Sequence, residues 1–187
     1  FRRVLFRSKG TNSVLVMSMI RAMFRLVVNT TQTAGTILSW ANRGICGETN
    51  FEHFASASLI NFNPATKQIQ FATAGTTPVL LYSVAKGAVE RKSISCEPIG
   101  VEKTTTYKDI QFTVSQGDII ITYSDGVVEA LNAEGKQYSL ERLSNLIKTN
   151  SKLAGKDLAS LIKSDIKKFI GSEALHDDQT LLVVKIQ

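Results

Sequence analysis

The middle of the chain, from about residue 54 to residue 123, is a block of short β-type segments separated by turn signals. Helical patterns lie on both sides of this block, and strands and helices do not alternate along the chain. The run Ile119-Ile120-Ile121-Thr122-Tyr123 is continuous in β-forming residues, which is typical of a strand buried on both faces. This organisation predicts an α+β fold, in which antiparallel sheet packs against helices.

The individual elements follow from apolar period and turn chemistry. The predicted strands cover residues 54–62, 69–73, 79–82, 110–114, 119–123 and 181–186, and Asn63-Pro64-Ala65-Thr66 marks the turn of a hairpin between the first two. The predicted helices cover residues 14–28, 33–43, 139–148 and 156–170, with Gly171 as the stop of the last. In the first helix the apolar stripe contains Val14, Met17, Ile20, Met23, Phe24 and Val27.

Length and composition fit one ordinary globular domain. The chain has 187 residues, of which 43% are hydrophobic and 20% charged. Its net charge of +6 raises the question of nucleic acid, but the lysines of residues 148–168 are diluted by Asp157 and Asp165 and carry no stacking aromatics among them. We therefore expect no nucleic-acid partner.

The environment of the domain is predicted from its cysteines and its hydropathy. Cys46 and Cys96 are too few for a disulfide framework, which favours a reducing compartment and a cytoplasmic domain. No apolar run approaches the roughly 20 residues that cross a bilayer, so we expect no membrane contact by this domain.

The first eight residues have neither a capping pattern nor a clear period. The segment from Arg2 to Ser8 is what a common sequencing adapter would encode if it were read through in frame. We hypothesise that residues 1–8 are not native, exclude them from fold reasoning, and place the domain at residues 9–187.

Carboxylates at strand ends are the candidate chemical groups, because the chain has only two histidines and no glycine-rich phosphate loop. Asp125 follows the buried strand directly and precedes Gly126, and Asp177 and Asp178 come just before the last strand. Such oxygens could converge on a hard cation such as Mg²⁺ or Mn²⁺. The alternative is that both segments are ordinary solvated turns.

Several motifs in order resemble the PPM phosphatases, and more narrowly their SpoIIE-like bacterial branch. The segment 117–130, Gly-Asp-Ile-Ile-Ile-Thr-Tyr-Ser-Asp-Gly-Val-Val-Glu-Ala, resembles the family's central signature, and His176-Asp177-Asp178-Gln179-Thr180-Leu181 resembles its terminal Asp-Asp-x-Thr. Weaker matches are Lys9-Gly10, residues 71–78, Glu97-Pro98-Ile99-Gly100-Val101 and residues 138–143. The resemblance covers nearly everything from Lys9 to Gln187.

This resemblance implies a sandwich of two packed antiparallel β-sheets flanked by α-helices, here with the first strands missing. It implies a protein serine/threonine phosphatase with two divalent cations, Mn²⁺ or Mg²⁺, which activate a water as the nucleophile, so that no side chain is itself catalytic. Asp125 and Asp177 match metal-binding carboxylates, and Asp178 matches an outer ligand. Glu129 would be structural, while Asp118, Gly117 and Gly126 would shape the turns around the strand.

The sequence departs from the family at two places. Arg7 and Ser8 stand where the first motif's bridging Asp and glycine should lie, so the chain as given could be inactive. Thr76 and Thr77 replace a His and an Asn in a hairpin outside the metal set, where we expect little effect on chemistry.

Three functions therefore stay open. The first is hydrolysis of phosphoserine or phosphothreonine on a regulatory protein such as an anti-anti-sigma factor. The second is a catalytically dead relative that only binds such a partner. The third is an unrelated α+β domain that binds a nucleotide or a phosphate. The resemblance leaves open a dimer, and a membrane anchor in upstream segments of the parent protein.

Overall fold

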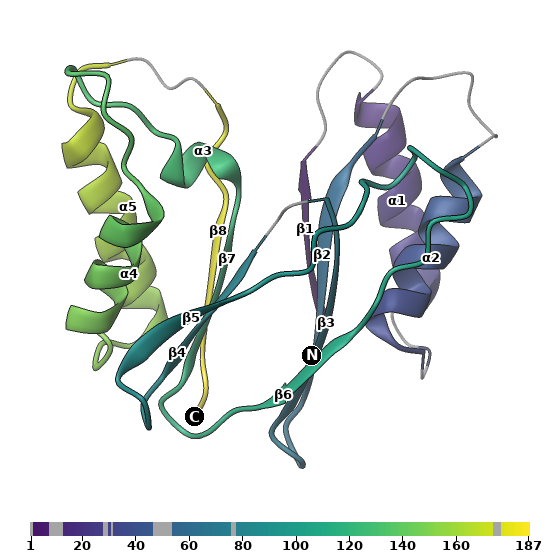
Figure 1. Ribbon diagram of the computed structural model, residues 1–187, viewed down its shortest axis with the longest axis horizontal. Helices are drawn as coiled ribbons and strands as arrows, with labels where there is room; N and C mark the ends of the chain where they lie inside the picture. Colours follow the sequence, from purple (N-terminus) through teal and green to yellow (C-terminus); the bar gives the residue numbers. More distant parts are fainter. Residues whose placement is uncertain are drawn as a thin grey trace. The chain divides into compact units, whose positions relative to one another are not determined.

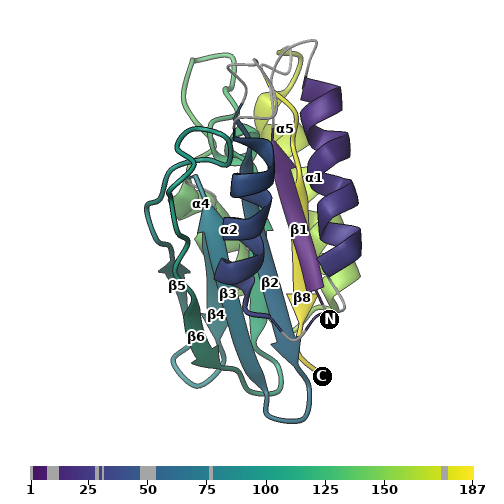
Figure 2. The ribbon, with the colours of Figure 1, turned by 90° about the vertical axis from the view of Figure 1, so that its right-hand side faces the viewer.

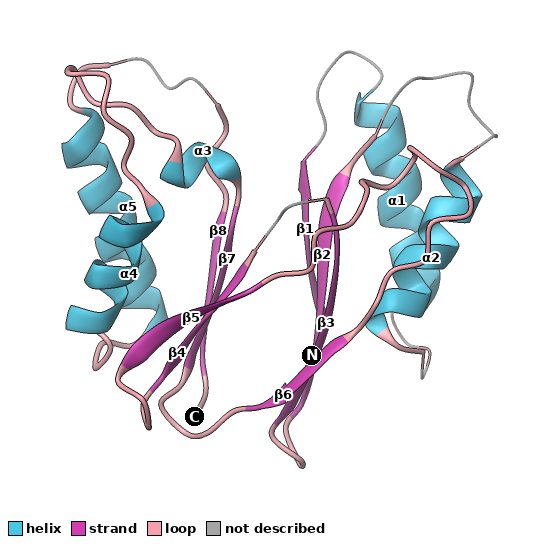
Figure 3. Ribbon diagram, viewed as in Figure 1, coloured by secondary structure: helices cyan, strands magenta, loops and turns pink. Residues whose placement is uncertain are grey.

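The computed structural model describes residues 2–7, 13–27, 30, 32–46, 54–75, 78–173 and 177–187, with side chains described from Met17 onward. The chain divides into two compact units. Unit 1 comprises Phe1–Pro78 and Ser93–Thr113, and unit 2 comprises Val79–Lys92 and Val114–Gln187. Each unit contains one four-stranded sheet with its own helices (Figures 1 and 3).

Unit 1 is an antiparallel sheet with two helices on one face (Figure 2). The strand order is β1-β2-β3-β6, with β1 at Arg2–Arg7, β2 at Ser56–Asn63, β3 at Gln68–Ala74 and β6 at Ile110–Thr113. Helix α1 spans Ser13–Val27 and helix α2 spans Ala34–Ile45. Buried apolar side chains of both helices and of β2 and β3 form one core, which includes Ile20, Ile37, Leu38, Leu59 and Ala72.

Local sequence explains where these elements begin and turn. Thr33 is the N-cap of α2, and its side chain accepts a hydrogen bond from the Thr36 amide at 3.2 Å. Asn63 ends β2, and its Oδ1 accepts from the amides of Ala65 and Thr66, which closes the hairpin to β3. The predicted hairpin is confirmed. Met17 departs from the predicted apolar stripe of α1, because its side chain is 44% exposed.

Strand β1 lies in the segment that we excluded from fold reasoning. Arg2–Arg7 pairs antiparallel with β2, from Arg2 opposite Asn61 to Arg7 opposite Ser56. The physical reason is that β2 would otherwise have an unpaired edge, and the central residues Val4, Leu5 and Phe6 favour extended backbone. A strand thus lies in a segment for which we had predicted no element, while the non-native origin of residues 1–8 stays a hypothesis.

Unit 2 is a second antiparallel sheet, with strand order β5-β4-β7-β8. Its strands are β4 at Val79–Ser83, β5 at Ala88–Lys92, β7 at Ile119–Tyr123 and β8 at Leu181–Lys185. Its helices are α3 at Asp125–Val128, α4 at Leu140–Thr149 and α5 at Gly155–Ile170. All five residues of the central strand β7 are buried, as predicted.

The apolar periodicity of the sequence did not predict strand β5. Its residues Glu90, Arg91 and Lys92 carry charge, and the strand lies at the edge of the sheet, where charged side chains protect an unpaired backbone. Lys86 and Lys92 both donate to the Glu90 carboxylate and lower its pKa to about 2. An edge strand of this kind has no apolar alternation to recognise.

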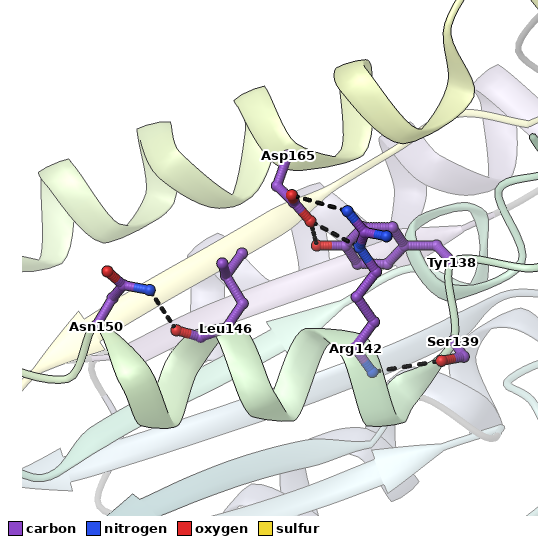
Figure 4. Close-up of polar contacts among 6 residues, drawn as sticks. All are labelled: Tyr138, Ser139, Arg142, Leu146, Asn150 and Asp165. Carbon is purple, nitrogen blue, oxygen red and sulfur yellow. Dashed lines mark hydrogen bonds and ion pairs between the residues drawn. The ribbon is translucent and has the colours of Figure 1, made fainter.

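A polar cluster joins α5 to α4 and to Tyr138, which lies two residues before α4 begins (Figure 4). The Arg142 guanidinium donates to both oxygens of Asp165, from Nε at 2.9 Å and from a terminal nitrogen at 3.0 Å. The buried Tyr138 hydroxyl donates to the same carboxylate at 2.7 Å. Phe169 packs edge-on against the Tyr138 ring, and the Arg142 cation lies 4.9 Å from the Phe169 ring centroid. The hydrogen bonds from Arg142 lower the pKa of Asp165.

The ends of α4 and α5 follow their sequence signals. Ser139 caps α4 by accepting from the Arg142 amide at 3.3 Å, and Gly171 ends α5 with a φ of 68°. Among the described residues, no helix is long and apolar enough to span a bilayer.

Replacing Asp165 by Asn tests the polar cluster. The charge-assisted bonds to Arg142 are lost, so we expect Asp165→Asn to lower the free energy of unfolding by about 1–2 kcal/mol at pH 7. The folded pKa of Asp165 is lowered, so its contribution to stability is present above about pH 4 and is lost as the pH falls through the folded pKa. Denaturant unfolding at pH 7 and pH 3 measures both effects.

The matched control is Asp157→Asn, an exposed carboxylate on the same helix. We expect that change to cost less than about 0.5 kcal/mol. A stability loss for Asp165→Asn that is equally large at pH 3 would contradict the assignment, because the stabilisation from a lowered folded pKa declines once the pH falls below the unfolded value of about 3.9.

Candidate metal-binding edge

Pairing between β7 and β8 determines where the candidate carboxylates lie. In the antiparallel register Ile119 lies opposite Lys185, and Tyr123 lies opposite Leu181. The residues that follow β7 therefore face the residues that precede β8. This geometry brings Asp125 to the same end of the sheet as Asp177 and Asp178, although 177 − 125 = 52 positions separate the first two in sequence.

Ser124 extends this pairing one step beyond the strands. Its amide donates to the Thr180 carbonyl at 3.0 Å. Its hydroxyl donates to the Asp178 carbonyl at 3.0 Å and accepts from the Thr180 amide at 2.9 Å. The side chain is only 8% exposed, so these bonds are made largely away from water, where an unpaired polar group would be costly. Ser124 thus fixes the backbone on both sides of the candidate site.

Gly126 allows the two segments to touch. A Cβ atom on Gly126 would lie 2.6 Å from the Asp178 carbonyl oxygen and 3.3 Å from Cβ of Asp177. The Gln179 side chain spans the same gap, with its Nε2 donating to the Gly126 carbonyl at 3.0 Å. The close approach of the backbone therefore requires glycine at this position. The backbone conformation does not, because the φ of Gly126 lies outside the left-handed region.

The three predicted carboxylates differ in their surroundings. Asp125 is half-buried and is the first residue of α3, so its backbone begins that helical turn, with the Glu129 amide donating to its carbonyl at 2.9 Å. Asp177 is half-buried, and its Oδ1 accepts from the Asp178 amide at 2.9 Å. Asp178 is exposed. The structure thus brings all three predicted residues to one edge of unit 2.

Asp118 and Gly117 lie at the opposite end of β7 from this edge, and Glu129 is the C-cap of α3. Asp118 precedes β7 and is 4% exposed, and its two oxygens accept from the Val84 and Ser115 amides, both at 2.8 Å. Gly117 has a φ of 89°, which favours glycine in that turn. Glu129 is exposed at the end of α3. The positions of Asp118 and Gly117 agree with the turn-shaping roles that we expected, and the structural role of Glu129 stays a prediction.

The donor set suits a hard cation in its chemistry, because Asp125, Asp177 and Asp178 offer carboxylate oxygens. The close approach of Gly126 to residues 177–178 holds those donors on adjacent backbone segments. Within the described part of the chain, however, no group of three or more His, Cys, Asp or Glu side chains is placed to hold a metal ion. Lys9, Gly10, Thr76, Thr77 and both histidines lie outside the described residues.

Sequence reasoning named the carboxylates and missed the residues that position them. Ser124, Gln179 and Thr180 belong to the motifs quoted above, but they had been given no role. The signal that could have found Ser124 is a hydroxyl residue directly after a fully apolar strand, where a buried polar group needs partners.

Relatives of known structure have the same fold. The chain superposes on the SiaA-PP2C domain of Pseudomonas aeruginosa with a TM-score of 0.83 at 15% identity, covering 100% of this chain and 80% of that one. It superposes on the PP2C phosphatase domain of SpoIIE from Bacillus subtilis with a TM-score of 0.80 at 17% identity, covering 99% and 55%. The predicted fold class, an α+β fold with two antiparallel sheets flanked by helices, is confirmed.

Sequence comparison identifies a relative and a family. The chain is 27% identical over 179 residues to the phosphoserine phosphatase RsbU of Bacillus subtilis strain 168, covering 95% of this chain and 52% of that protein. The chain thus spans about half the length of this curated relative. The family described as stage II sporulation protein E matches residues 8–187. Because that match takes in nearly the whole chain, the chain belongs to the SpoIIE family, as its motifs predicted.

Proposed function

We propose that this chain is the phosphatase domain of a metal-dependent serine/threonine protein phosphatase. The observation that carries the proposal is the pairing of β7 with β8, which sets Asp125 beside Asp177 and Asp178 at one end of the sheet. Membership of the SpoIIE family and the likeness to a phosphoserine phosphatase support it.

Asp125 and Asp177 would hold two divalent cations, Mn²⁺ or Mg²⁺, with Asp178 as an outer ligand. Such cations lower the pKa of a water and so supply the nucleophile. Ser124 carries the hydroxyl nearest in sequence to Asp125. This hydroxyl donates to the Asp178 carbonyl and accepts from the Thr180 amide. That engagement favours a positioning role for Ser124, and no side chain of the chain is needed as nucleophile.

The substrate in this proposal is a phosphorylated regulatory protein, of the anti-anti-sigma type. The name of the relative from Bacillus subtilis, a phosphoserine phosphatase, supports phosphoserine as the group that is hydrolysed. The resemblance to the SpoIIE-like branch supports a switch protein as the carrier of that phosphoserine.

A second candidate function is a catalytically dead domain that binds the same phosphoprotein. It is favoured because, among the described residues, no three His, Cys, Asp or Glu side chains are placed to hold one metal ion. It is favoured also by Arg7 and Ser8 at the positions where the family's first motif has a bridging Asp and a glycine.

Metal-dependent hydrolysis separates the two candidates. We expect the chain to hydrolyse p-nitrophenyl phosphate in Mn²⁺, and we expect Asp125→Asn and Asp177→Asn each to lower kcat/KM by about 100-fold or more, since each removes a proposed ligand charge. Glu134→Gln is the control, because Glu134 is an exposed carboxylate of the same unit that pairs with Lys136. Absence of activity in a folded, Mn²⁺-supplied chain would favour the binding module for the chain with Arg7 and Ser8 in place of the first motif.

Gly126→Ala tests the positioning of the carboxylates without removing one. The added Cβ meets the Asp178 backbone at 2.6 Å, so residues 177–178 must move away from Asp125. We expect Mn²⁺ affinity, measured by calorimetry, to fall about tenfold or more. Gly155→Ala is the matched control, because its Cβ would make ordinary contact at 3.6 Å. Equal Mn²⁺ affinity in both variants would contradict a site that spans these two segments.

A further inference from the structure

A pocket of about 400 Å³ lies in unit 2, lined by residues of α5, α3 and the start of β8. Its apolar lining includes Val127, Ile166 and Leu181, of which the first two are buried. Its polar lining includes Lys156, Ser160 and Lys163. The pocket therefore combines an apolar surface with two cationic side chains.

The two lysines give the described lining of the pocket two positive charges. Lys156 and Lys163 are seven residues apart on α5, which places them on the same face of the helix, and both are exposed. Neither forms an ion pair with another described residue, and no described Asp or Glu lines the pocket. An occupant with negative charge would therefore be favoured.

Residues close to one another in the sequence form the pocket and the candidate metal-binding edge. Val127 is two residues after Asp125, and Gln179, which also lines the pocket, is two residues after Asp177. Gln179 lines the pocket, and its side chain also donates to the Gly126 carbonyl at the candidate metal-binding edge. A peptide that presented a phosphoserine at the edge would have its neighbouring residues near this pocket.

We propose that this pocket docks the acidic segment next to the phosphoserine in the substrate protein, with one apolar side chain of that segment against Val127, Ile166 and Leu181. The inference rests on the proposed function, since it assumes that a phosphoprotein is presented at the edge formed by Asp125 and Asp177. The apolar lining distinguishes this occupant from a free anion, which would gain nothing from it. The described residues of the lining include no aromatic side chain, which disfavours stacked nucleic-acid bases.

Binding of labelled peptides to the metal-free chain tests the proposal without hydrolysis. The probe is a fluorescein-labelled peptide with one unphosphorylated serine flanked by Glu residues and a Leu, because the carboxylates of the metal-free edge would repel a phosphoserine. The comparison peptide has Lys in place of each Glu. We expect the acidic peptide to bind at low salt and Lys163→Glu to weaken it about fivefold or more, because a favourable charge becomes a repulsive one. Lys148→Glu changes the net charge equally on α4, outside the pocket, and should leave the peptide affinity within about twofold.

Thermal unfolding of each variant establishes that it is folded, and Lys163→Gln, expected to act in the same direction but less, replaces Lys163→Glu if that variant unfolds. Equal affinity of the chain and of Lys163→Glu for the acidic peptide would overturn the proposal, as would equal binding of the Lys peptide. Complete competition by millimolar inorganic phosphate would assign the pocket to a free anion instead. Dissociation of a dimer by Lys163→Glu in sedimentation would assign it to a second copy of the chain.

Hydrolysis of p-nitrophenyl phosphate by the unaltered chain reports separately on the proposed function. Peptide binding that depends on Lys163 in a chain without this activity supports the docking pocket and contradicts catalysis. Activity combined with peptide binding that does not depend on Lys163 contradicts the docking pocket alone.

Discussion

Backbone pairing between β7 and β8 is the interaction on which the rest of unit 2 depends. It places β7 at the centre of a sheet, where all five of its residues are buried, and it brings the end of one motif against the start of another. The Ser124 hydroxyl continues the pairing with a donated and an accepted hydrogen bond. Without the pairing of β7 with β8, only the connecting turns would hold the carboxylates of Asp125 and Asp177. A small cation demands near-ideal ligand geometry, which the paired strands help to provide.

The helices of unit 2 support this edge from one side. Helix α5 contributes Leu158, Ile162 and Ile166 to the core beneath the sheet, and the bond between Asp165 and Arg142 links α5 to α4. Lys185 in β8 donates to the carbonyls of Ser151 and Leu153, which ties the connection between these helices to the last strand. One face of α5 thus packs inward, while its lysine-bearing face lines the pocket beside the candidate site.

The sequence predicted most of the fold, because a regular apolar period over a long segment indicates a helix or a strand without knowledge of the segments that pack against it. The buried strand β7, the hairpin of β2 and β3, and helices α2, α4 and α5 are all confirmed within a few residues. Strand β5 was missed because its charges suit an edge, and β1 because a six-residue segment is ordered only by pairing with β2. The carboxylates were named from motif and strand-end position, but register decides which segments meet, so the roles of Ser124 and Gln179 needed coordinates.

The central claim is that Asp125 and Asp177 share one metal site. Crystals of the chain grown with Mn²⁺ and measured at the manganese absorption edge test it directly. The account predicts an anomalous peak at about 2–2.3 Å from a carboxylate oxygen of each residue. Well-ordered carboxylates at this edge, with no manganese between them in crystals that hold it elsewhere, would contradict it.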